Sequence, residues 1–200
     1  LPYQGELYLY KHGAIKVCED RRHFEHEDST PFFWMGDTWW MALSRMRWPG
    51  DFKELVSDRK EKGFNLVQVV AGLFPEFKES VNPPKEPLPE FAANESGTAW
   101  DNDFNSLRPE YFDAADKRIK YLIEQGITPC IVGAWGYFMP WMGEANIKAH
   151  WRYLIARYGA FPVIWIGAGE ANLPYYADEV FPDDRQKQAR RWSDVTRYVR

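Results

Sequence analysis

The feature that most constrains the fold is a pattern that occurs three times, in which a helical segment ends in glycine and an apolar stretch follows within a few residues. The glycines are Gly63, Gly126 and Gly159. Glycine commonly ends a helix because it adopts the left-handed backbone conformation easily. The apolar stretches do not alternate with polar residues, which is typical of strands buried on both faces of a parallel sheet. The pattern therefore predicts an α/β protein built from right-handed βα units.

The pattern also gives the order of the elements. Continuous apolar stretches predict four strands, at residues 32–36, 66–70, 128–132 and 163–166. Apolar residues at helical spacing predict four helices, at residues 51–62, 109–125, 143–158 and 183–200. The last helix is expected to turn Val195 and Tyr198 inward. A proline-rich loop is predicted over 72–107, and a β-hairpin segment with strands at 7–10 and 15–17 is predicted within residues 1–30.

Four βα units make half of a (β/α)8 TIM barrel, which usually needs about 250 residues. A half barrel would expose two strand edges, which folded proteins avoid. Two interpretations follow: a complete open-sheet α/β protein, or a fragment whose other four units lie beyond residue 200. We favour the fragment, because the chain stops inside a predicted helix. Residues 31–200 are then the N-terminal half of the barrel.

Charge and motif content exclude several functional classes. The 25 basic and 29 acidic residues give a net charge of −4, so we predict no nucleic-acid partner and no anionic membrane surface. No stretch of 18 apolar residues occurs, and the two cysteines make no disulfide framework. No phosphate-binding loop, serine nucleophile elbow or dinucleotide motif is present. His23 and His26 lie far from the predicted rim and lack the further ligands that a metallohydrolase barrel needs, so no metal and no cofactor is predicted. The compartment stays open, with a secreted or periplasmic location favoured.

Glu170 is the strongest candidate for catalysis. It follows the apolar strand and the small residues Gly167, Ala168 and Gly169. In an α/β barrel the carboxyl ends of the strands form the rim that carries the catalytic groups. A single carboxylate there, followed by Asn172 and by Tyr175 and Tyr176, suggests a sugar-cleaving acid. The alternative is a helix cap or an ion pair with an arginine.

Aromatic residues make up 17% of the chain, and several fall where strands are predicted to end. Flat rings beside carboxylates suit the C–H faces of sugars. The residues predicted to stack on substrate are Trp39, Trp135 and Trp141. The loop residues Glu76, Trp100, Asp101 and Asp103 could wall one end of a cleft, whereas His150 is expected to pack against the barrel wall.

Two further polar residues remain open between a binding role and a structural role. Asp37 is either an acceptor for sugar hydroxyls or a cap for the turn at Thr38. A minority interpretation pairs Asp37 with Glu170 in an inverting enzyme, which requires about 6.5 to 9.5 Å between the carboxyl groups. Gln68 is either a sugar contact or a buried amide satisfied by packing.

Four segments together resemble the apiosidase-like family of glycoside hydrolases. They are residues 32–40, 58–68, 133–137 and 156–171. The resemblance implies a (β/α)8 glycosidase barrel, typically bacterial and acting on plant or host oligosaccharides or polysaccharides. It also implies a retaining mechanism, with Glu170 as the acid/base and the nucleophile after a seventh strand, beyond residue 200.

The resemblance has one departure and two consequences. Gly169 stands where many related barrels have an asparagine that holds the sugar 2-hydroxyl, and Asn172 is the candidate to replace it. These 200 residues alone are predicted to be inactive, because half of the catalytic pair is missing. The alternative within the same fold is a carbohydrate-binding barrel without catalysis.

Overall fold

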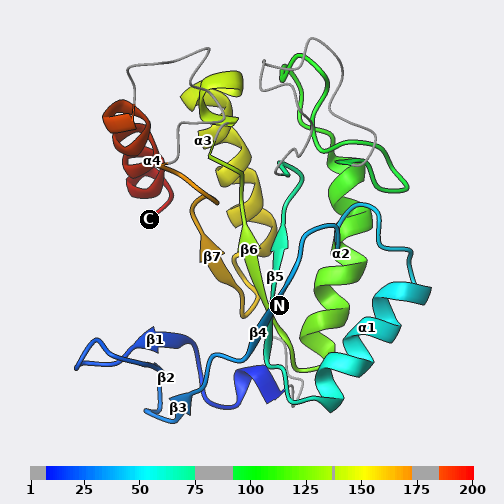
Figure 1. Cartoon of the computed structure of the whole chain (residues 1–200), viewed down its shortest axis with the longest axis vertical. Helices are drawn as coiled ribbons and strands as arrows, with labels where there is room; N and C mark the ends of the chain where they lie inside the picture. The colour runs from blue at the N-terminus through cyan, green and yellow to red at the C-terminus, as the bar shows by residue number, and fades with distance from the viewer. Residues whose placement is uncertain (1–7, 75–91, 137, 173–184) are drawn as a thin grey trace.

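The computed structural model describes residues 8–74, 92–136, 138–172 and 185–200, and its elements form two sheets. The smaller sheet is antiparallel, in the order β1 (Ile15–Val17), β2 (Phe24–His26) and β3 (Pro31–Phe32). Figure 1 shows this small sheet at the end of the parallel sheet where β4 begins. The strand predicted at 15–17 is confirmed. The strand predicted at 7–10 is wrong, because Tyr8–Tyr10 forms a 3-10 helix.

In the part of the chain that the structure describes, the larger sheet contains four parallel strands in the order β4-β5-β6-β7. They are β4 (Gly36–Trp39), β5 (Leu66–Val70), β6 (Thr128–Val132) and β7 (Ile164–Ile166). The predictions for β5 and β6 are confirmed to the residue, and β7 begins one residue later than predicted. The parallel α/β fold inferred from the sequence is therefore confirmed for these four strands.

The predicted position of the first parallel strand is wrong. Pro31–Phe32 pairs with β2 in the small sheet, and Phe33 next to it is 77% exposed. The aromatic residues of this segment pack locally instead, with the rings of Phe24 and Trp34 5.1 Å apart. The parallel strand begins only at Gly36, so Asp37 lies inside β4 and not at its carboxyl end.

Within the described residues, four α-helices accompany the parallel strands. They are α1 (Gly50–Glu61), α2 (Pro109–Glu124), α3 (Phe138–Tyr158) and α4 (Arg185–Val199). Gly63 and Gly126 have φ of +80°, as expected of glycines that end helices. Gly159 follows α3 without a positive φ. The third helix starts before its predicted position and contains a kink at Gly143, where φ is 77°. Among the described helices, none combines the length and hydrophobicity that crossing a membrane requires.

The two faces of the parallel sheet have different neighbours. Trp39, which aligns with Val69, packs its ring 5.7 Å from that of Phe52 in α1. On the other edge strand, Trp165 packs 5.8 Å from Trp151 of α3. This row of residues therefore faces α1 and α3. Because strand residues alternate between faces, the row that contains Gln68 lies on the opposite face.

Helix α4 packs along α3, but its inward face differs from the prediction. Val195 is buried, as predicted, whereas Tyr198 is 48% exposed. Trp192, one turn before Val195, is buried in its place. Residues three positions apart share a helix face, so Trp192 and Val195 form the inward stripe.

Candidate active site

The candidate site forms where β6 and β7 continue beyond their last strand residues. The backbone N–H of Gly169 donates to the Ala134 carbonyl oxygen at 3.0 Å, and the N–H of Gly136 donates to the Gly169 carbonyl oxygen at 2.7 Å. Trp135 and Gly169 form an isolated parallel bridge. These contacts extend the sheet at its carboxyl end and place the residue after Gly169 beside Trp135.

Trp135 holds the carboxylate of Glu170. The indole Nε1 of Trp135 donates a hydrogen bond to Glu170 Oε2 at 2.9 Å. The Trp135 ring is buried, whereas Glu170 is half-buried. Glu170 also has a φ of 50°, a left-handed conformation that is uncommon for residues other than glycine. Such backbone conformations persist where the surrounding structure enforces them, and they concentrate at functional sites.

Gly169 and Gly136 allow this close approach. A Cβ at position 169 would collide with ring carbons of Trp135, and a Cβ on Gly136 would lie 2.5 Å from the carbonyl oxygen of Glu170. An asparagine at position 169 would therefore displace Trp135 and break its hydrogen bond to Glu170. The departure from related barrels at this position has a physical reason, which is the placement of the Trp135 ring.

The aromatic residue that meets Trp135 at the site is Trp40, in the turn directly after β4, which the sequence interpretation missed. Its ring lies 5.3 Å from that of Trp135 in an edge-to-face arrangement, and Trp40 is 40% exposed. The predicted residue, Trp39, is instead buried against Phe52. The two tryptophans are adjacent in the chain, and no local pattern in the sequence shows which of them contacts Trp135.

Asp37 lies on the helix-facing side of β4 and is held by three donors. Its carboxylate accepts hydrogen bonds from Arg59 Nε of α1 at 2.6 Å, Trp39 Nε1 at 3.1 Å and the Thr38 backbone N–H at 2.8 Å. Partial burial acts to raise the pKa of Asp37, but these hydrogen bonds outweigh burial and hold the pKa below its usual value. The structure thus gives Asp37 a structural ion pair, and its position does not support either sugar binding or pairing with Glu170.

The remaining predicted residues are less closely gathered. Gln68 is partly exposed and aligns with Thr38 on the face of the sheet away from the helices. Trp141 of α3 is partly buried, with its ring 5.3 Å from that of Phe138. Asn172 is exposed, two residues beyond Glu170. Glu76, Tyr175 and Tyr176 lie outside the described residues.

A buried histidine, His150, bonds the backbone just before Trp135. Trp100 Nε1 donates to His150 Nδ1 at 3.1 Å, and His150 Nε2 lies 2.7 Å from the Gly133 carbonyl oxygen. Because Nδ1 accepts, Nε2 carries the proton and donates to Gly133, two residues before Trp135. Burial lowers the pKa of His150 to about 4, against weaker opposing effects of hydrogen bonds to Gly133 and Ala71. The prediction that His150 packs inside is confirmed, but Trp100 is buried and does not wall a cleft.

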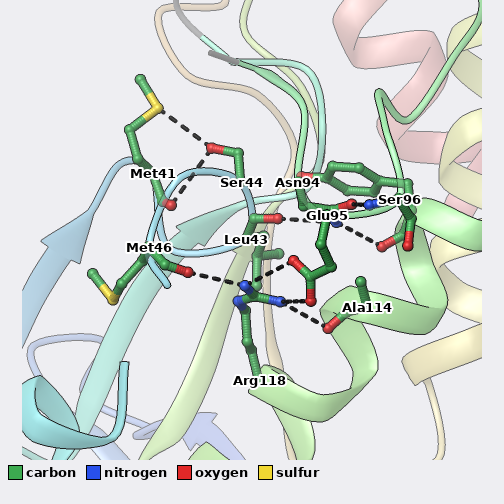
Figure 2. A network of polar contacts seen from close by, with 10 residues as sticks. Met41, Leu43, Ser44, Met46, Asn94, Glu95, Ser96, Ala114 and Arg118 are labelled. Carbon is green, nitrogen blue, oxygen red and sulfur yellow. Dashed lines mark hydrogen bonds and ion pairs between the residues drawn. The ribbon is translucent and has the colours of Figure 1, made fainter. Parts of the chain in front are cut away.

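Figure 2 shows a second network, which ties the segment after residue 91 to the segment after β4. Arg118 of α2, 1% exposed, donates to both carboxylate oxygens of Glu95 at 3.0 Å and to the Met46 carbonyl oxygen at 2.9 Å. Beside it, Asn94 Nδ2 donates to the Leu43 carbonyl oxygen at 3.3 Å. These contacts fix the two segments relative to α2.

A carboxylate and tryptophan rings lie together just beyond the carboxyl ends of the parallel strands. The family model "Apiosidase-like, catalytic domain" matches residues 18–200. The chain therefore belongs to the apiosidase-like family, and the resemblance seen in the sequence is confirmed. No curated protein sequence matches the chain.

Solved structures share the fold. A glycoside hydrolase family 5 protein from Bacteroides vulgatus aligns with a TM-score of 0.70 and 24% identity over 95% of this chain and 37% of that one. A protein described as a glycoside hydrolase aligns with a TM-score of 0.69 and 23% identity, over 94% of this chain and 38% of that one. At these identities the likeness establishes the fold alone. The chain spans less than two fifths of the length of either structure.

Proposed function

We propose that the protein carrying this chain is a retaining glycoside hydrolase that acts on an oligosaccharide or polysaccharide, with Glu170 as its general acid/base. The observation that carries the proposal is the 2.9 Å hydrogen bond from Trp135 Nε1 to the half-buried Glu170 carboxylate at the carboxyl end of the parallel strands. Membership of the apiosidase-like family supports the same reaction class. The nucleophile is assigned to a strand beyond residue 200, so the isolated chain is predicted to be inactive.

The geometry suggests how Glu170 would work. The indole N–H engages Oε2, which orients the carboxyl group and leaves Oε1 as the oxygen assigned to proton transfer. In the first step Glu170 would protonate the leaving glycosidic oxygen while the nucleophile attacks the anomeric carbon. In the second step the ionised Glu170 would take a proton from water, which then releases the sugar from the nucleophile.

Trp135 and Trp40 have different proposed roles in binding. Trp135 is buried and contributes mainly its N–H, whereas the partly exposed ring of Trp40 offers the apolar surface on which a sugar ring would stack. Asn172, exposed near Glu170, is proposed to contact the 2-hydroxyl in place of an asparagine at position 169. Gln68 and Trp141 stay predicted substrate contacts of lesser weight.

The test is Glu170→Gln in the full-length protein, assayed with two glycosides that share the sugar and differ in the leaving group. Glutamine keeps the size and the acceptor for Trp135 but cannot donate the proton. With a poor leaving group the rate should fall by about 10²- to 10⁴-fold. With a leaving group that needs no protonation, formation of the glycosyl-enzyme should be nearly unaffected. Wild-type rates with both substrates would remove Glu170 from the mechanism.

Two further variants sharpen the test. Trp135→Phe keeps a ring but removes the N–H, and we expect a loss of about tenfold in kcat from poorer orientation of the carboxyl group. Glu144→Gln on α3, where Glu144 bonds Lys148, is the matched control and should leave the rate unchanged. Circular dichroism of each variant checks that the fold is retained.

The alternative is a barrel that binds carbohydrate without cleaving it. One observation favours it, namely that Gly169 replaces the asparagine that holds the 2-hydroxyl in many related barrels. Binding to a glycan array with no turnover of the bound glycan by the full-length protein would support this alternative. Turnover that disappears in Glu170→Gln would support the hydrolase.

A further inference from the structure

A group of three different metal-binding side chains lies in the turn between β1 and β2, in the small sheet at the opposite end of β4 from the candidate active site (Figure 1). Cys18, Asp20 and His23 each offer one ligand atom, and these atoms all lie within 4.8 Å of one another. His23 Nδ1 is 3.3 Å from Asp20 Oδ1. The group lies apart from every residue assigned above to the reaction.

The backbone of the turn is already ordered around these side chains. The Cys18 N–H donates to the His23 carbonyl oxygen, and the Arg21 N–H donates to the Cys18 carbonyl oxygen, both at 2.9 Å. The Arg22 N–H donates to Asp20 Oδ1, also at 2.9 Å. Arg21 adopts a left-handed conformation, with φ of 58°, which completes the tight reversal. The three donor side chains are therefore brought together by the turn itself, before any ion binds.

We propose that this turn binds one divalent transition-metal ion, with zinc as the best match. A cysteine sulfur and a histidine nitrogen select zinc and its neighbours over magnesium and calcium, which prefer oxygen ligands. Bond lengths to zinc are about 2.0 to 2.3 Å, so ligand atoms around a tetrahedral ion lie roughly 3.3 to 3.8 Å apart. The His23–Asp20 pair already meets this spacing. The longest separation must close by on the order of 1 Å, which the exposed side chains can accommodate.

The turn lies at the surface, where water can reach a bound ion. The side chains of Asp20 and His23 are 52% and 48% exposed, and Cys18 is partly buried. Three protein ligands leave a fourth position, which water would occupy. The bound ion would tie together the two ends of the β1–β2 turn and so stabilise the small sheet. This inference does not depend on the proposed glycosidase activity.

The experiment uses full-length protein without a histidine tag, freed of metal by a chelator. Calorimetric titration with Zn²⁺ should show one site per chain, and Co²⁺ should give the charge-transfer absorption of a cobalt–thiolate bond. Cys18→Ser should abolish that absorption, and His23→Gln should weaken zinc binding by at least about tenfold. Asp20→Asn should weaken zinc binding while the cobalt–thiolate absorption remains.

Two variants serve as matched controls. Cys130→Ala removes the other cysteine, which is buried in β6 and whose pKa burial raises to about 12, so it should not alter metal binding. His26→Gln removes a neighbouring histidine outside the group and should likewise have no effect. Absence of the cobalt–thiolate absorption in the wild type, or its persistence in Cys18→Ser, would overturn the proposal. Because Cys18, Asp20 and His23 lie in a turn at the surface, circular dichroism should show the same fold in their variants as in the wild type.

Discussion

Mild acid is expected to destabilise this protein through His150, a completely buried residue that the reaction does not use. The ring is neutral in the native state because Nδ1 accepts from Trp100 while Nε2 donates to the Gly133 carbonyl oxygen. A proton added to Nδ1 would face the Trp100 N–H donor and would place a charge where water cannot reach. Burial therefore lowers the pKa of His150 to about 4, from an ordinary value of 6.5.

The sign and size of the effect follow from these two values. In the unfolded chain His150 binds a proton near pH 6.5, whereas the native protein does so only near pH 4. The free energy of unfolding should thus be unaffected by this group above pH 6.5, fall as the pH drops from 6.5 to about 4, and level off below. One pKa unit corresponds to about 1.4 kcal/mol, so the full loss is about 3 kcal/mol.

The assay is urea unfolding of the full-length protein between pH 7 and pH 4.5, compared with His150→Gln. The variant should have a lower free energy of unfolding at pH 7. Between pH 7 and pH 4.5 its free energy of unfolding should fall by about 2 to 3 kcal/mol less than that of the wild type. Carboxylates with lowered pKa values, such as Asp37 and Glu95, lose their stabilising effect mostly at lower pH and are common to both proteins. Equal losses in the wild type and His150→Gln would refute the reasoning.

Two further predictions concern packing at the rim and the buried arginine. Gly169→Ala should lower the free energy of unfolding by about 1 to 3 kcal/mol and change the tryptophan fluorescence, because the added Cβ would displace the Trp135 ring. A variant with wild-type stability and an unchanged fluorescence spectrum would contradict this account. Glu95→Ala should lower the free energy of unfolding by roughly 2 kcal/mol, because it leaves the buried Arg118 without its carboxylate partner. Arg118→Met should lower it less, because the Glu95 that remains is 44% exposed and can be rehydrated. Urea unfolding measures both variants, and a larger loss in Arg118→Met would overturn that ranking.

The elements that could be predicted from the sequence are those with local signals. Strands β5 and β6 are continuous apolar stretches that follow a helix and its terminal glycine, and both were located to the residue. The first strand was misplaced because residues 32–35 are as apolar as a buried strand. Only the pairing of Phe32 with Phe24 in the small sheet shows that this segment belongs elsewhere.

The candidate site was predicted only where a local signal marks it. Glu170 follows an apolar strand and three small residues, so its place at a strand end could be read locally, although its role as acid/base stays a prediction. The choice between Trp39 and Trp40 depends on which face of β4 meets α1. Asp37 looked like a strand-end carboxylate, but Arg59, 22 positions along the chain, holds it on the helix-facing side.

The sequence by itself determined the succession of βα units and the family, because glycines, apolar stretches and short motifs act over a few neighbouring residues. The tertiary structure alone decided which side chains meet. The hydrogen bond from Trp135 to Glu170 joins residues 35 positions apart, and that from Trp100 to His150 joins residues 50 apart. Such contacts depend on strand register and on the face that each side chain takes, and a shift of one residue reverses that face.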